Sequence, residues 1–137
     1  MIYTSYFAKL KSLPKNVIPI SICAKAPDWY KGLQYKKLAP KYDLLMSWKE
    51  TKDEEHYMRV FHEQILGQLD AHTVINELYE MLPEQQKTLW KMTNCPCWEN
   101  PMVNIALICF EKPTDFCHRH LVANWFQDAG IEVEEWS

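Results

Sequence analysis

The run "VNIALICF", residues 103–110, constrains the fold of this chain more than any other stretch. It is apolar at both sets of alternating positions. Val103, Ile105, Leu107 and Cys109 lie on one side, and Ala106, Ile108 and Phe110 lie on the other. Because successive side chains of a strand point to opposite faces, such a strand must be covered on both. Parallel sheets flanked by helices bury their strands in this way, so the run predicts a core strand of an α/β sheet.

The rest of the chain supplies the other elements that such a sheet needs. β-Branched and aromatic runs predict strands at residues 1–7 and 17–24, and "IEVEEW", residues 131–136, alternates like a final strand. Pro19 predicts an edge position or an irregular start for the second strand. Helices are predicted over residues 40–50, 52–69, 71–82 (capped by Asp70 and ended by Pro83) and 118–128. We therefore expect one α/β domain over residues 1–137, a small sandwich with a mostly parallel sheet flanked by helices.

The sequence also bears on the cellular compartment. No apolar run approaches the ~20 residues of a membrane span, and the first residues lack the apolar core of a secretory signal. Five cysteines are an odd number, which does not fit a closed disulfide framework. We expect a cytoplasmic protein with reduced thiols and no membrane partner. The sequence does not indicate an oligomeric state.

Chemically active side chains cluster directly after the buried run, in "CFEKPTDFCHRH", residues 109–120. Ligands of parallel α/β sheets bind beyond the carboxyl ends of the strands, where Cys109 and Glu111 are expected. Asp115 is the predicted N-cap of the following helix, which places Cys117 in its first turn. The unpaired amide groups and the dipole of that turn attract anions.

These residue types suggest a site for a phosphorylated or otherwise anionic ligand, such as a nucleotide. Arg119 and the helix amides are expected to hold the anion, and the same positive field is expected to lower the pKa of Cys117. In a thiol-dependent enzyme Cys117 would be the nucleophile, with Glu111 and His118 as proton-transfer groups. Whether the chain is an enzyme stays open. Further candidate ligand-binding residues are Cys109, Lys112, Trp29, Tyr30 and Lys31.

Each of these residues also has a purely structural interpretation. Cys109 and Cys117 could be buried thiols, because free cysteine behaves as a small hydrophobic residue. Glu111 could be a solvated carboxylate or the ion-pair partner of Arg119. His118 and the histidine at position 120 cannot both face the core, being two residues apart on a helix. The residues of this cluster lie together at a predicted strand end and a predicted helix start, and this shared position favours a functional site.

A different class of function is suggested by the lysine-rich stretch of residues 25–49. The first fifty residues carry a net positive charge and the rest a net negative charge, within an overall −3. Lysines attract phosphate and aromatic faces stack on bases, so the stretch also predicts a non-catalytic nucleic-acid-binding module. Alternatively the lysines are solvated and the aromatic residues fill the core. Those residues are Trp29, Tyr30, Tyr35, Tyr42 and Trp48.

A zinc-stabilised interaction protein is the remaining alternative. C-x-C at positions 95–97 is not the usual C-x-x-C knuckle, and no second knuckle follows. The favoured interpretation therefore includes no metal and no cofactor. The possible zinc ligands are Cys95, Cys97, Cys109, Cys117, His118 and His120.

The segment "ICFEKPTDFCHRHLVANWF" resembles the carboxyl-terminal signature of the domain-of-unknown-function family numbered 488. Members of that family typically carry a strand that ends in C-x-E and a helix that starts with C-H-R. "IYTSYFAKL", "VIPISICAKAPDWYKGLQYKKLAPKYDLL" and the acidic helix also look like bacterial and phage members, so the resemblance spans most of the chain. Residues 84–102 depart from it like an insertion. The resemblance implies a compact cytosolic α/β fold and the same site, without a substrate. The signature falls on Cys109, Glu111, Cys117, His118 and Arg119.

Overall fold

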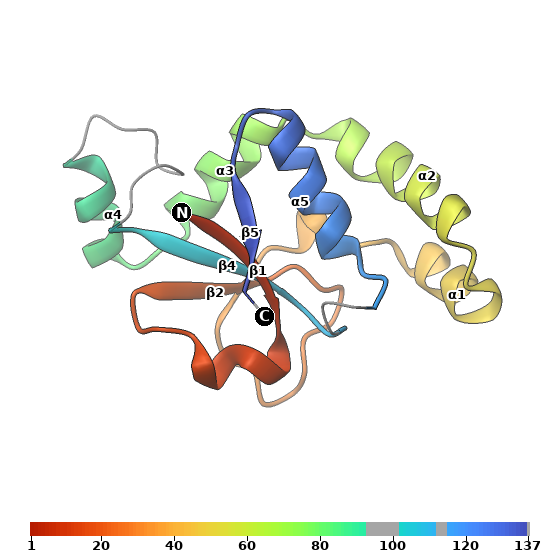
Figure 1. Cartoon of the computed structure of the whole chain (residues 1–137), viewed down its shortest axis with the longest axis horizontal. Helices are drawn as coiled ribbons and strands as arrows, with labels where there is room; N and C mark the ends of the chain where they lie inside the picture. Colours follow the sequence, from red (N-terminus) through yellow and green to blue (C-terminus); the bar gives the residue numbers. More distant parts are fainter. Residues whose placement is uncertain (93–101, 112–114, 137) are drawn as a thin grey trace.

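A parallel sheet forms the centre of the molecule (Figure 1). The computed structural model describes residues 1–92, 102–111 and 115–136. Within these ranges the sheet has five strands in the order β3-β2-β4-β1-β5, and every neighbouring pair is parallel. The predicted α/β fold is therefore confirmed. The strands are β1 (Ile2–Tyr6), β2 (Val17–Ser21), β3 (Leu33–Gln34), β4 (Asn104–Cys109) and β5 (Val133–Glu135).

The described helices follow the apolar spacing of the sequence. Asp70 caps α3, since its carboxylate accepts a hydrogen bond from the Thr73 backbone N–H at 2.9 Å. Gly130, with φ of +83°, follows the end of α5 as predicted. Within the described ranges, no helix reaches the length and apolar character that a membrane crossing requires. The α-helices are α1 (Tyr42–Thr51), α2 (Glu54–Gln64), α3 (Ala71–Glu80), α4 (Glu84–Lys91) and α5 (His118–Asp128).

The middle strand, β4, is buried on both faces. It lies between β2 and β1, and all six of its residues are buried. Ile105 and Leu107 belong to a larger core that includes residues of α2, α3 and α5. Ala106 and Ile108 belong to a smaller core on the other face, which η1 (Phe7–Ser12) and the chain after β2 cover. The two-sided burial predicted for this run is confirmed for residues 103–109, whereas Phe110 is 50% exposed.

Two of the predicted elements differ in the structure, and the two-residue strand β3 was not predicted. The helix expected over residues 52–69 ends at Gln64 and is followed by the 3-10 helix η3 (Leu66–Gln68). A Cβ added at Gly67 would lie 2.8 Å from the His62 carbonyl oxygen, so glycine permits this close return of the chain. β2 is internal and not at the edge, but Pro19 lies where β2 pairs with β4 alone, because β3 begins opposite Ile20.

Candidate functional site

The carboxyl ends of β2 and β4 lie beside each other at one edge of the sheet. The chain leaves β2 toward the smaller core, in which Cys23 and Tyr30 pack. It leaves β4 toward α5, whose Val122 and Phe126 pack in the larger core on the opposite face. Connections that leave neighbouring strands toward opposite faces open a crevice, and ligands of parallel α/β proteins bind there.

A pocket of about 270 Å³ lies at this edge, and we refer to it as the carboxyl-edge pocket. Cys23, after β2, and Cys109, at the end of β4, contribute to its lining. Cys117 and His118 reach it from the start of α5. The pocket therefore joins segments that are far apart in the sequence, and it includes the predicted cluster after β4.

Three aromatic rings form much of the apolar wall of the pocket. Trp48 of α1 and Phe116 have ring centroids 4.6 Å apart, and Tyr57 of α2 lies 5.1 Å from Phe116. Tyr57 is buried, and burial, followed by the nearby thiols and Glu111, raises the pKa of its phenol. The Tyr57 hydroxyl therefore stays protonated at neutral pH and can act as a hydrogen-bond donor.

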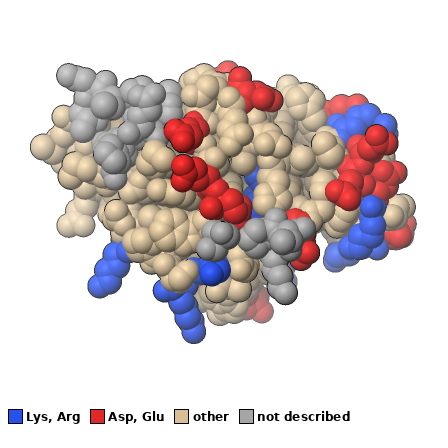
Figure 2. Space-filling model, viewed as in Figure 1, with Lys and Arg blue, Asp and Glu red and all other residues tan. Residues whose placement is uncertain are grey.

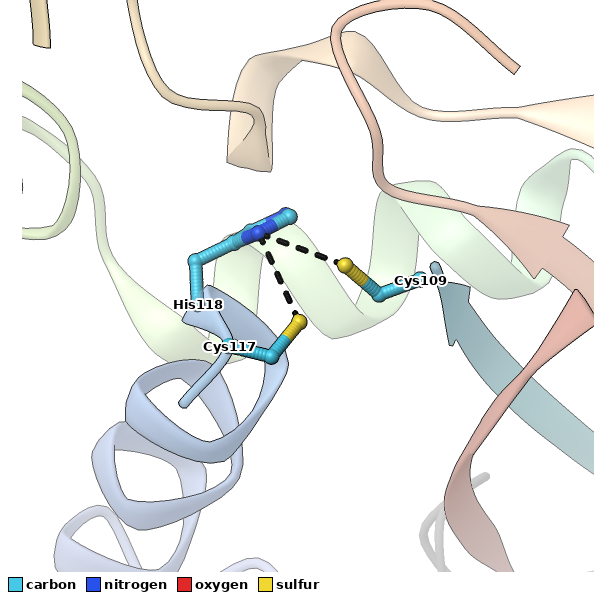
Figure 3. A group of neighbouring side chains, drawn as sticks. All are labelled: Cys109, Cys117 and His118. Atoms are coloured by element: carbon cyan, nitrogen blue, oxygen red, sulfur yellow. Dashed lines mark hydrogen bonds between the residues drawn. The ribbon is translucent and has the colours of Figure 1, made fainter. Parts of the chain in front are cut away.

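Two thiols converge on one histidine ring (Figure 3). The Nδ1 atom of His118 lies 3.5 Å from Cys109 Sγ and 3.9 Å from Cys117 Sγ. All three residues are buried, and their potential ligand atoms lie within 4.8 Å of one another. The structure thus brings together three of the residues that the sequence singled out.

The orientation of the His118 ring is fixed from its other side. Its Nε2 atom lies 2.8 Å from the backbone carbonyl oxygen of Ile22, just after β2, and Phe61 packs edge-on against the ring. A carbonyl oxygen can only accept, so Nε2 carries the proton of this bond. In the neutral ring Nδ1 is then an acceptor, and its lone pair faces the two sulfur atoms.

The expected activation of Cys117 is wrong. α5 begins at His118, and Cys117 occupies the N-cap position with extended backbone, so Asp115 is not the cap. Cys117 is 4% exposed. Burial, followed by the hydrogen bond with Cys109, raises the pKa of the Cys117 thiol far more than His118 lowers it. The side chain is therefore a protonated thiol at neutral pH when only protein groups surround it.

Arg119 is fully buried and does not line the carboxyl-edge pocket. Its Nε and Nη2 atoms donate to the two carboxylate oxygens of Glu135 in β5, at 3.2 and 3.1 Å. Its Nη1 donates to the backbone carbonyl oxygen of Glu111, and its guanidinium lies 5.7 Å from the centroid of the Tyr6 ring. Arg119 therefore links Glu111, after β4, to Glu135 of β5. The sequence had suggested instead that Arg119 binds an anionic ligand.

Glu111 and two lysines are the charged residues of the pocket lining. Glu111 is exposed, and its Oε2 atom lies 3.4 Å from Cys109 Sγ, so it accepts from that thiol. Arg119 forms its ion pair with Glu135 and not with the side chain of Glu111. Lys25 and Lys49 are exposed and line the same pocket. The charged part of the lining therefore carries a net positive charge.

The other predicted ligand-binding residues lie elsewhere or outside the described ranges. The Tyr30 hydroxyl donates to the carbonyl oxygen of Leu33 at 2.7 Å, and burial raises its pKa to about 12. Trp29 is 61% exposed and packs edge-on against Phe7 in the smaller core. Lys31 is exposed, and none of these three residues lines the pocket. Lys112 lies outside the described residues, as do the cysteines at positions 95 and 97.

The lysine-rich stretch does not present its aromatic residues as one exposed platform. Tyr30 and Tyr35 are buried and Trp48 lines the pocket, which leaves Trp29 and Tyr42 strongly exposed. On the face shown in Figure 2, the lysine and arginine side chains form separate groups and no continuous basic surface. These observations favour the interpretation in which the aromatic residues mostly pack internally.

Sequence reasoning did not single out Cys23 or Tyr57 as site residues, and it placed Lys25 and Lys49 only in the candidate nucleic-acid-binding stretch of residues 25–49. A signal for Cys23 was present, because it follows a predicted strand and the carboxyl ends of parallel strands meet at one edge. No comparable signal marked Tyr57, and none placed Lys49 at this pocket, because their approach depends on how α1 and α2 fold over the sheet edge.

Comparison of the chain with protein-family models, with curated proteins and with solved structures gave no match. The resemblance to the family numbered 488 stays a prediction. Support for a function comes from the geometry of the described residues.

Proposed function

We propose that this protein binds a small anionic molecule, of the size and kind of a nucleotide, in the carboxyl-edge pocket. The observation that carries the proposal is the pocket itself, about 270 Å³ in volume at the carboxyl ends of parallel strands. Binding pockets for small molecules measure about 300–1,000 Å³, so this one suits a small or partly exposed ligand. Parallel α/β sheets bind their ligands at this edge.

The chemistry of the walls supports an anionic ligand with a flat apolar part. Trp48 and Phe116 offer ring faces for stacking, and Tyr57 offers a phenol that stays protonated. Lys25 and Lys49 supply positive charge on flexible side chains at the exposed part of the pocket. A base or another planar group against the rings would leave its phosphate within reach of these lysines.

The proposal changes the role of Arg119 and keeps His118 and Glu111 as polar groups of the site. Arg119 acts as a positioning residue, because its guanidinium is bound to Glu135 and to the Glu111 carbonyl. Glu111 lines the pocket and is a group able to transfer protons to or from a bound ligand. His118 lines the pocket with its Nδ1 atom facing the two thiols. The thiols in the described ranges, those of Cys23, Cys109 and Cys117, are free. Free thiols support a reducing compartment such as the cytoplasm.

The proposal is tested by titrating the full chain with adenosine 5′-monophosphate, adenosine and inorganic phosphate while recording amide resonances. We expect the monophosphate to bind most tightly and to shift resonances of residues that line the pocket. The variant Lys25→Glu/Lys49→Glu should bind it about tenfold more weakly, because each exposed charge contact is worth up to about 1 kcal/mol.

The matched control is Lys11→Glu/Lys15→Glu, which makes the same change of charge at exposed lysines outside the pocket lining. It should retain the affinity of the original chain. Equal weakening in both double variants, or no resonance shift with any of the three compounds, would overturn the proposal.

A further inference from the structure

The three side chains drawn in Figure 3 have the composition of a metal site. Thiolate sulfur and imidazole nitrogen are the donors that zinc prefers in proteins. Cys109 comes from the end of β4, while Cys117 and His118 come from the start of α5, so two separate segments hold the three donors. Within the described ranges, the potential ligand atoms of these three side chains converge on one point.

The distances from His118 Nδ1 to the two sulfur atoms are close to those of a tetrahedral zinc centre. With Zn–S of about 2.3 Å and Zn–N of about 2.0–2.1 Å, neighbouring tetrahedral ligand atoms lie about 3.5–3.8 Å apart. The His118 Nδ1 atom lies 3.5 Å from Cys109 Sγ and 3.9 Å from Cys117 Sγ. An ion between these atoms would therefore require only small movements of the side chains.

His118 is oriented as a metal ligand is. In metal sites the ring nitrogen that does not bind the ion donates its proton to a carboxylate, a backbone carbonyl or water, which fixes the tautomer. Here Nε2 donates to the Ile22 carbonyl oxygen at 2.8 Å, and the Nδ1 lone pair is left facing both sulfur atoms. One ion placed between these atoms would be bound by the Nδ1 lone pair and by both sulfur atoms together.

We propose that Cys109 Sγ, Cys117 Sγ and His118 Nδ1 bind one zinc ion, whose fourth position opens into the carboxyl-edge pocket. Two thiolates balance the charge of the ion, so the buried centre would be electrically neutral. Three protein ligands with one open position are typical of zinc sites that act on a bound molecule. The inference rests on the pocket of the proposed function and deepens it, since the ion would offer a ligand oxygen a positive contact.

Cys23 is the residue that decides whether the site is open or closed. It is buried and lines the pocket, but its Sγ atom lies 3.8 Å from the Ile108 carbonyl oxygen, to which it donates. It is not among the residues whose donor atoms all lie within 4.8 Å of one another. We therefore assign the fourth position to the pocket and not to Cys23.

The test is a titration of the full chain with Co²⁺ and then Zn²⁺, in the variant Cys95→Ser/Cys97→Ser, which removes the two cysteines outside the described ranges. We expect one Co²⁺ per chain, with the intense visible absorption of a tetrahedral ion and sulfur-to-metal charge-transfer bands. One equivalent of Zn²⁺ should abolish both. In that variant Cys109→Ser, Cys117→Ser and His118→Ala should each lose stoichiometric binding.

Two matched controls separate ligands from bystanders. His62→Ala removes an exposed histidine of α2, and Cys23→Ser removes the third described thiol of the pocket lining. Both variants should keep one Co²⁺ per chain and the same spectrum. Loss of binding in Cys23→Ser would replace the open site with a closed Cys₃His site and overturn the proposal.

A second measurement uses chains that keep all three ligands, so its result does not depend on whether a ligand variant folds. Zn²⁺ should protect the thiols of Cys109 and Cys117 from alkylation, as read by mass spectrometry of their peptides. Unchanged alkylation with Zn²⁺, or a weak spectrum typical of six oxygen ligands, would also overturn the proposal. The titrations contain no organic ligand, and Lys25→Glu/Lys49→Glu should bind the metal normally. Failure of the metal site is therefore distinguishable from failure of the proposed function.

Discussion

Arg119 is the largest side chain that is fully buried in the described part of the chain. Its charge is balanced by Glu135, whose side chain is 25% exposed. When a buried guanidinium has one carboxylate partner, removal of either group leaves the charge of the other uncompensated. Because Nη1 also donates to the Glu111 carbonyl oxygen, the pair fixes the position of Glu111 after β4.

Glu135→Gln should therefore lower the free energy of unfolding by about 3 kcal/mol, since removing one partner of a buried pair costs about 3–5 kcal/mol. Arg119→Met should cost somewhat less, because the remaining Glu135 carboxylate can be hydrated. Urea unfolding of both single variants and of the double variant measures the two costs and their coupling. The exposed pair of Lys37 and Glu77 is the control, and Lys37→Met should cost less than about 1 kcal/mol. Equal costs at the two pairs would contradict the account.

Cys117 should behave as a buried thiol and not as an activated one. Its pKa is raised, so the pH midpoint of its alkylation rate should lie above that of the same residue in the urea-unfolded chain, which is about 8.5. The experiment uses iodoacetamide at a series of pH values, with a chelator present and mass spectrometry of the Cys117 peptide. Faster labelling in the folded than in the unfolded chain at pH 7 would show that the pKa is lowered instead.

Among the elements, those whose signals are local follow the sequence closely. α5 has the predicted bounds, and β4 was recognisable because its apolar residues occupy both faces. The N-cap Asp70 and the terminal Gly130 were readable because capping and positive φ are properties of a few neighbouring residues. The N-cap of α5 was less readable, since Asp115 and Cys117 lie close together and only the backbone conformation distinguishes them.

The cap of α3 gives a prediction about pH. Hydrogen bonds from the Thr73 backbone N–H and hydroxyl lower the pKa of Asp70 below that of the unfolded chain. Its contribution to stability is therefore present above the unfolded pKa of about 3.9 and is lost as the pH falls through the lower folded value. In thermal unfolding, Asp70→Ala should be less stable than the original chain at pH 7, and the difference should shrink toward pH 2. Asp70→Asn, which still caps but does not titrate, is the control. A constant difference for Asp70→Ala from pH 7 to pH 2 would contradict the role of the charge.

At the scale of the whole molecule, the site depends on contacts that no local pattern encodes. β4 enters the sheet between β1 and β2, and this order brings the end of β4 beside the chain after β2. The partner of Arg119 could not be predicted, because Glu135 reaches it only through the pairing of β5 with β1. The sequence therefore located the cluster of Cys109, Cys117 and His118, but not the walls of the pocket or the role of Arg119.

That the two thiols and the His118 ring form one metal-binding centre is tested most directly by X-ray absorption at the zinc edge. The sample is the full chain with Cys95→Ser/Cys97→Ser and one equivalent of zinc. We predict two sulfur ligands at about 2.3 Å and two nitrogen or oxygen ligands at about 2.0–2.1 Å, one from His118 and one from the open position. A shell of nitrogen and oxygen alone, or one with three or four sulfur atoms, would contradict it.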